Sequence, residues 1–196
     1  LERYPADLAG TESATEGPAA AGYVYDPLMR EDWSLADDFA FLEPRSFEFG
    51  EPGKAGRSRN EWGCVWEKID PGIVGQVVEH PLASRDESKS YRFPDPLAYW
   101  RWNEPEIRSG LERARQSGKH VLAYAGNLFE LSQWLRGYEN LMVDLMLYPG
   151  EVKLLIGHPA EYLEATVSKW LEYGVDGVAF NDDWGTQSQP MIPPEI

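Results

Sequence analysis

Beyond Asn103 the chain alternates between stretches with a helical period and short apolar runs, and this alternation limits the folds it can adopt. The first stretch, which Gly118 closes, has apolar residues at i, i+4 and i+7, the spacing of one helix face. Those residues are Ile107, Leu111 and Ala114. We expect Asn103 to cap this helix, and residues 121–125 to form the strand that follows it. Helices between short apolar strands indicate βαβ units with a parallel sheet.

The same alternation continues to residue 182. Helices are expected at residues 128–136 and 138–146, and a strand is expected at residues 152–156. A long helix then ends at Gly174, and residues 175–182 predict a final buried strand. The apolar residues that define these last two helices are Tyr138, Leu141, Met142, Leu145 and Met146 in one and Leu163, Val167, Trp170 and Leu171 in the other. The pattern predicts an α/β fold.

The beginning of the chain has a different character. Residues 1–60 are rich in Gly, Pro, Ser, Ala and acidic residues and show no sustained period of 2 or 3.6. Aromatic residues within this stretch favour docking on a surface, so we expect an irregular, partly docked segment with a short helix at residues 35–42. The chain is therefore divided into this loop-rich segment and an α/β domain at residues 61–196.

A hairpin is expected at the start of the α/β domain. Residues 62–69 and 75–79 have the composition of strands, and a turn at residues 70–72 joins them with proline and glycine at consecutive positions. The short connection predicts antiparallel pairing. A short aromatic helix is expected after the hairpin, at residues 97–102.

Composition argues against two classes of partner. The net charge of -15, from 33 acidic and 18 basic residues, is unfavourable for binding nucleic acid, whose phosphates need a clustered basic surface. No apolar run approaches the roughly 20 residues that a membrane helix needs. Cys64 is the single cysteine, which makes a reducing, cytoplasmic location the expectation.

Both ends of the sequence have the character of cut ends. The first residue is Leu1, and the last residues, 192–195, have the prolines and the acid that open a helix. We therefore interpret the chain as an internal fragment of a longer protein.

Polar residues follow two of the expected strands at the point where each strand ends. Asp182 and Asp183 follow the last strand, and Gly126 and Asn127 follow the strand at residues 121–125. The carboxyl ends of parallel strands are where α/β enzymes hold their active sites. Asp182 and Asp183 are therefore the catalytic candidates, although Asn and Asp are equally common in ordinary turns.

Further residues are candidates for binding a substrate. Gly126 allows close approach of a ligand to the backbone, and Asn127 offers both a donor and an acceptor. Gln187, close after the two aspartates, and the acid and aromatic pair Glu61 and Trp62 are also candidates. No metal site is expected within the chain, because Cys64 shares no ligand spacing with its histidines, His80, His120 and His158.

Two stretches of the chain resemble the uroporphyrinogen decarboxylase superfamily. They are Trp-Leu-Arg-Gly-Tyr-Glu-Asn-Leu-Met at residues 134–142 and Val-Asp-Gly-Val-Ala-Phe-Asn-Asp-Asp-Trp-Gly-Thr at residues 175–186. Asn-Glu-Trp-Gly-Cys-Val-Trp at residues 60–66 and the stretch at residues 81–96 resemble a bacterial branch of the superfamily. That branch is closer to corrinoid-dependent methyltransferases than to the decarboxylase of haem synthesis.

The resemblance implies a (β/α)8 barrel of the TIM type, of which this chain would be a part truncated at both ends. A closed barrel needs about 250 residues. In the decarboxylase, the strand that ends in Phe-Asp-Ser-Trp-Ala-Gly resembles residues 180–185, with Asp182 at the position of its aspartate, and Ala125-Gly126 matches the opening of the pocket helix. The chain departs from the decarboxylase in the pocket helix, where the decarboxylase has a tyrosine and this chain has Gln133-Trp134 in the neighbourhood. Trp134 is another candidate for substrate binding. The last strand of such a half-barrel would leave an unpaired edge.

The resemblance implies methyl transfer between a small substrate and a corrinoid or thiol acceptor. The alternatives are decarboxylation of uroporphyrinogen and a barrel that only binds a tetrapyrrole. The arginine-rich clamp of the decarboxylase would lie before Leu1 and cannot be matched. This weakens the first alternative, because a substrate with many carboxylates needs guanidinium groups and this chain is strongly acidic. The related methyltransferases hold zinc through a His-x-Cys pair and a later cysteine. Those ligands would fall after Ile196. The reaction also implies a corrinoid protein as a partner.

Overall fold

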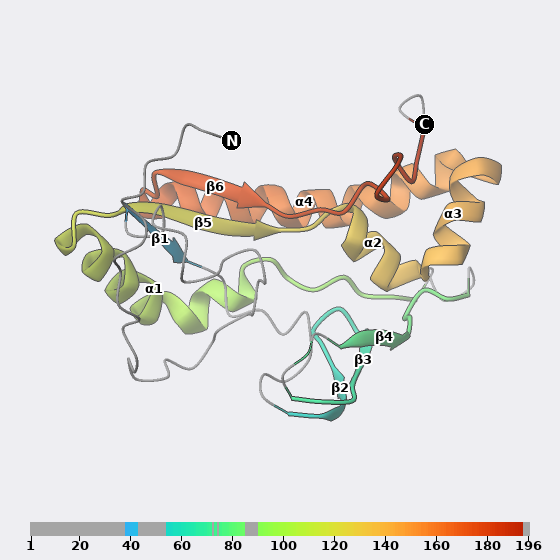
Figure 1. Ribbon diagram of the computed structural model, residues 1–196, viewed down its shortest axis with the longest axis horizontal. Coiled ribbons are helices and arrows are strands. Elements are labelled where there is room, and N and C mark those ends of the chain that lie inside the picture. The colour runs from blue at the N-terminus through green and yellow to red at the C-terminus, as the bar shows by residue number, and fades with distance from the viewer. Residues whose placement is uncertain (1–37, 43–53, 72, 74, 85–89, 194–196) are drawn as a thin grey trace, which may run out of the picture.

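A computed structural model describes residues 38–42, 54–71, 73, 75–84 and 90–193 of the chain (Figure 1). Six strands and four helices form in this part of the chain. In chain order they are β1 (Phe39–Leu42), β2 (Gly56–Arg59), β3 (Val65–Lys68), β4 (Gln76–Glu79), α1 (Ala98–Gln116), β5 (His120–Gly126), α2 (Phe129–Arg136), α3 (Tyr138–Leu147), α4 (Pro149–Tyr173) and β6 (Gly177–Phe180). The predicted α/β class is confirmed.

A parallel sheet organises the larger part of the structure. Its strand order is β1-β5-β6, with β5 in the centre and parallel to both neighbours. The second sheet, β2 to β4, and then helix α1 lie between β1 and β5 in the chain, and the helices α2, α3 and α4 lie between β5 and β6. In the described part of the chain, β6 pairs with β5 alone.

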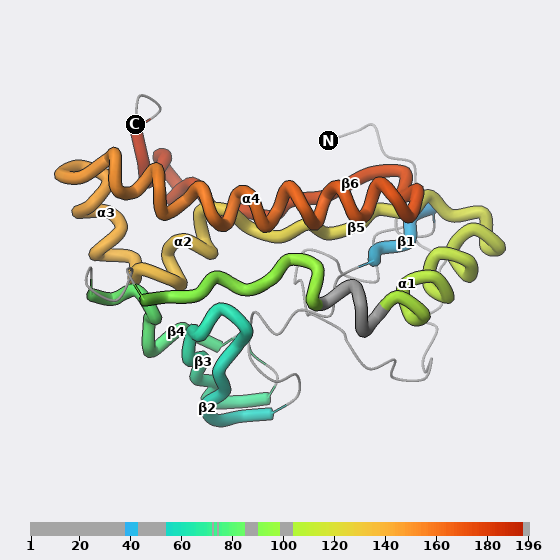
Figure 2. Tube along the Cα trace, turned by 180° about the vertical axis from the view of Figure 1, so that it is seen from behind, coloured from blue at the N-terminus to red at the C-terminus, as the bar shows by residue number. Residues whose placement is uncertain are grey.

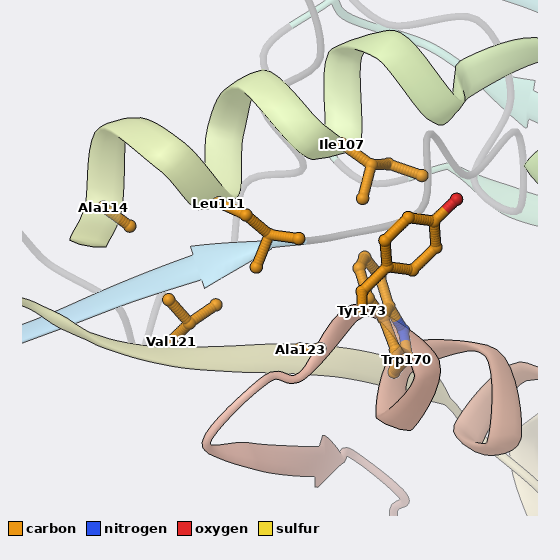
Figure 3. Packing of buried hydrophobic residues seen from close by; sticks show 7 residues of the cluster. All are labelled: Ile107, Leu111, Ala114, Val121, Ala123, Trp170 and Tyr173. Atoms are coloured by element: carbon orange, nitrogen blue, oxygen red, sulfur yellow. The ribbon is translucent and has the colours of Figure 1, made fainter. Parts of the chain in front are cut away.

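The helices α1 and α4 cover the same face of this sheet. Val121 and Ala123 of β5 point to one face, since successive residues of a strand alternate. Both are fully buried in a cluster that includes Ile107 and Leu111 of α1 and Trp170 of α4 (Figure 3). The Trp170 indole Nε1 also donates to the Tyr124 carbonyl oxygen at 2.9 Å. The other face, with Leu122 and Tyr124, is only half-buried.

A second, antiparallel sheet lies below the first in Figure 1 and has the order β2-β3-β4. The tube view from behind shows the same placement, with this sheet next to α2 (Figure 2). The hairpin predicted for residues 62–69 and 75–79 is confirmed as β3 and β4. Apolar side chains of β3 and of α2 share one buried cluster, to which Trp66 and Leu135 belong. Helix α2 therefore packs against the second sheet.

Two predicted elements are wrong. Residues 39–42, expected as the end of a helix, form β1, because pairing with the central strand outweighs local preference, while residues 35–37 lie outside the described part of the chain. Residues 152–156, expected as a strand, belong to α4. Val152, Leu155 and Ile156 lie at i, i+3 and i+4, which is a helical spacing. They pack in one cluster against α2 and α3.

Two boundaries also differ from expectation. Asn103 does not cap a helix, since α1 begins at Ala98 and runs through it; the backbone N–H of Leu97 instead bonds the Asp95 carboxylate at 2.9 Å. The last strand, expected at residues 175–182 and buried, is limited to β6 and is half-exposed. The helix expected at residues 192–195 lies mostly outside the described residues.

The described residues form two small sheets and no closed barrel. Of the helices described, none has the length and apolar character needed to cross a membrane.

Candidate functional site

The Asp182 carboxylate lies at the carboxyl end of the parallel sheet and caps helix α2. It lies two residues after β6, and three consecutive backbone N–H groups at the start of α2 donate to it. The N–H of Leu128 and of Phe129 bond its Oδ2 at 3.0 and 2.7 Å, and the N–H of Glu130 bonds its Oδ1 at 2.9 Å. These N–H groups have no partner within the helix, and the helix dipole favours an anion at this end.

Asp183 is in a different environment from Asp182. Its side chain is exposed, and its Oδ1 accepts the N–H of Gly185 at 3.1 Å, which is a local turn contact. The adjacent strand-end aspartates therefore differ in what holds them. Asp182 connects β6 to α2, whereas Asp183 remains open to solvent.

Asn127 is brought beside Asp182, as the carboxyl ends of adjacent parallel strands predict. It is 4% exposed and lies directly after β5. Its Oδ1 accepts a hydrogen bond from the Tyr124 hydroxyl, and its Nδ2 donates one to Oε2 of Glu130. The three side chains form a chain of hydrogen bonds from the central strand to the first turn of α2.

Glu130 is the group at this edge whose pKa the surroundings shift. Partial burial, and after it the charges of Asp182 and Asp183, raise the pKa of the Glu130 carboxyl to about 7. An acid with such a pKa is present in both protonation states near neutral pH, as a general acid or base requires. Glu130 was not among the site residues predicted from the sequence, although the Asn-x-x-Glu spacing from Asn127 resembles a capping box and could have indicated it.

An aromatic pair borders the carboxyl groups. Trp184 stacks on Phe129 with ring centroids 4.8 Å apart and planes 18° from parallel. Phe129 is buried, whereas Trp184 is 51% exposed. The chain then turns back at residues 185–190, where Gly185 bridges Pro190, and Gln187 lies exposed in this turn.

Gly126 is required by packing at this edge of the sheet. Its φ of 122° is a left-handed conformation that side chains rarely adopt. A Cβ atom here would also lie 2.8 Å from Cδ2 of Leu163 in α4. The close approach at this glycine is thus made by a side chain of the protein.

The other predicted binding residues lie apart from the carboxyl groups. Trp62 is 1% exposed and belongs to the cluster between β3 and α2, as does Cys64. Trp134 packs against this cluster, with its ring edge-on to Trp66 at 5.1 Å. Glu61 has an exposed side chain next to this cluster. The structure therefore separates the candidates into a carboxyl-edge group and a group at the interface of the second sheet.

Cys64 is expected to be unreactive in the folded protein. Its thiol is buried and donates to the Trp134 carbonyl oxygen at 3.3 Å, and burial raises the pKa of the thiol to about 12. Because the thiolate is the reactive form, a disulfide reagent such as DTNB should label Cys64 only after unfolding. Labelling of the native protein as fast as that of the protein in denaturant would contradict this placement.

Among the described residues, no group of three or more His, Cys, Asp or Glu side chains is arranged to hold a metal ion.

Compared with protein-family models, with curated proteins and with solved structures, the chain has no match.

Proposed function

We propose that this chain carries the acid–base wall of an enzyme pocket, in which Glu130 transfers a proton. The observation that carries the proposal is the raised pKa of Glu130, about 7, at the carboxyl edge of a parallel sheet. This edge is where α/β enzymes place reacting groups. In this assignment Asp182 is a structural cap, since three N–H groups already engage its oxygens.

The reaction we propose is methyl transfer from a small substrate, as in the uroporphyrinogen decarboxylase superfamily that the sequence resembles. The bond between the methyl carbon and its leaving group breaks as a nucleophile, a corrinoid or a thiol of a second molecule, takes the methyl group. The leaving group departs with the bonding electrons and takes the proton of Glu130. Protonated Glu130 is thus consumed in each cycle and is restored from solvent.

Electrostatics favours methyl transfer over decarboxylation of uroporphyrinogen. Asp182 and Asp183 lie with Glu130 at one edge, and the negative charges of the two aspartates would repel a substrate with several carboxylates. A neutral or cationic methyl donor experiences no such repulsion. The acceptor thiol is not Cys64, whose burial keeps it protonated.

A barrel remains our proposal for the complete fold. The three parallel strands have α1 and α4 on one face, which leaves the second face for a barrel interior, as in a segment of a (β/α)8 barrel. The zinc ligands and the corrinoid that the resemblance implies are likewise proposed for parts of the protein outside the described residues.

The test is the pH dependence of methyl transfer, with methylamines, methoxyarenes and methyl thioethers as donors and reduced cobalamin as acceptor. We expect the rate to fall as pH rises through about 7, because Glu130 loses its proton there. Glu130→Gln should reduce the rate by about 10²–10⁴-fold and remove this pH dependence. Asp183→Asn is the matched control, since it removes a nearby exposed charge and should change the rate by only about threefold.

Three results would overturn parts of this proposal. A Glu130→Gln variant as active as the original protein would exclude Glu130 as the proton donor. Conversion of uroporphyrinogen to coproporphyrinogen, without methyl transfer, would establish decarboxylation instead. Binding of a tetrapyrrole without turnover of any donor would favour a binding protein.

A further inference from the structure

We infer that Asn127, held in place by Tyr124, is a positioning residue that orients the Glu130 carboxyl and determines which of its two oxygens carries the proton. The inference rests on the proposed function, in which Glu130 transfers that proton. It assigns a role to two side chains that do not themselves have to touch a substrate.

The orientation of the Asn127 amide follows from its two contacts. An amide has an acceptor oxygen at one end and a donor nitrogen at the other, so fixing one end fixes the other. The Tyr124 hydroxyl donates to Oδ1, which directs Nδ2 to Oε2 of Glu130. Because Asn127 is 4% exposed, water competes poorly for either contact.

The contact with Nδ2 determines where the proton of Glu130 is located. Nδ2 can only donate, so Oε2 of Glu130 accepts a hydrogen bond in both protonation states. In the protonated carboxyl, the accepting oxygen is the carbonyl oxygen, and the proton is therefore on Oε1. The proton is thereby kept on the oxygen that is not bonded to Asn127.

The hydrogen bond from Asn127 acts on the pKa of Glu130 in the direction opposite to burial and to the neighbouring charges. A donor on the carboxylate favours the ionised form, as does the position of Glu130 in the first turn of α2. Partial burial and the charges of Asp182 and Asp183 favour the protonated form. Removing the Asn127 donor should therefore raise the pKa of Glu130, whereas removing the charge of Asp183 should lower it.

The experiment is an NMR titration of the side-chain carboxyl of Glu130 in protein labelled with ¹³C-glutamate, with Glu130→Gln to assign the signal. Asn127→Leu should raise the pKa of Glu130 by about one unit, a tenfold change in proton affinity. Tyr124→Phe, which keeps the ring in the fold but frees the amide to rotate, should raise it by a smaller amount. Asp183→Asn should shift it in the opposite direction.

The inference is overturned if Asn127→Leu and Tyr124→Phe leave the pKa of Glu130 unchanged or lower it. If Asn127→Leu fails to fold, as judged by its unfolding transition, Tyr124→Phe alone decides. The titration needs no substrate, so its outcome is separate from that of the proposed function. A shifted pKa together with a fully active Glu130→Gln variant would retain the positioning role and exclude the catalytic one.

Discussion

Asp182→Ala should lower the free energy of unfolding by about 3 kcal/mol, because three backbone N–H groups at the start of α2 lose their acceptor. A hydrogen bond to a charged group contributes about 1.5–3 kcal/mol, and part of the loss is offset as water reaches the exposed N–H groups. Asp182→Asn, which retains one acceptor oxygen and no charge, should lose roughly half as much. Urea unfolding followed by circular dichroism measures these differences.

The neighbouring aspartate supplies the control. Asp183 is exposed and accepts a single local N–H, so Asp183→Ala should stay within about 0.5 kcal/mol of the original protein. Equal stabilities of the Asp182→Ala and Asp183→Ala variants would show that the contact between the end of β6 and α2 is not structural.

Arg136→Met is the second substitution with a large expected effect, a loss of about 3–5 kcal/mol. Nε of Arg136 bonds Oδ2 of Asp144 at 2.8 Å, and the two side chains are 9% and 12% exposed. The guanidinium also donates to the carbonyl oxygens of Leu82 and Ala83. The substitution would leave a buried carboxylate and two carbonyl groups without this partner, at the point where α2, α3 and the segment after β4 meet.

An exposed ion pair on α1 is the matched control. Arg108 bonds Glu104 at 2.6 Å, one helical turn away, but the side chains are 65% and 46% exposed. Arg108→Met should therefore destabilise the protein far less than Arg136→Met does. The double variant Arg136→Met with Asp144→Leu should be more stable than the sum of its single variants predicts, because no buried charge is left unpaired. Equal losses for Arg136→Met and Arg108→Met would contradict the buried role of Arg136.

The sequence predicted helices and strands best where a hydrophobic pattern was regular and turn residues marked the ends of the element. Strand β5 and helix α2 were predicted nearly to their boundaries, because an apolar run, a Gly-Asn turn and a helical stripe follow one another. Residues 152–156 were not, since a continuous apolar run fits both a buried strand and a helix face. Strand β1 could not be recognised locally, because four residues become a strand only by pairing with β5, about 80 positions later.

The candidate site was predicted in position but not in its division of roles. The rule that parallel strands end at one edge correctly placed Asn127 near Asp182. It could not show that Asp182 caps α2, since the N–H groups concerned lie 52 to 54 positions earlier in the chain. Glu130 was overlooked because its pKa shift arises from partial burial and, after it, from the charges of Asp182 and Asp183, and only the folded chain provides either.

The central claim is that Glu130, and not Asp182, is the proton-holding group at this edge of the sheet. The pH titration of the Glu130 carboxyl by ¹³C NMR in the unmodified protein tests it most directly. We predict a midpoint near pH 7, since burial and two neighbouring carboxylates disfavour the charge of Glu130. A midpoint near the ordinary glutamate value of about 4.3 would contradict the claim, because Glu130 would then be fully ionised at neutral pH and could donate no proton.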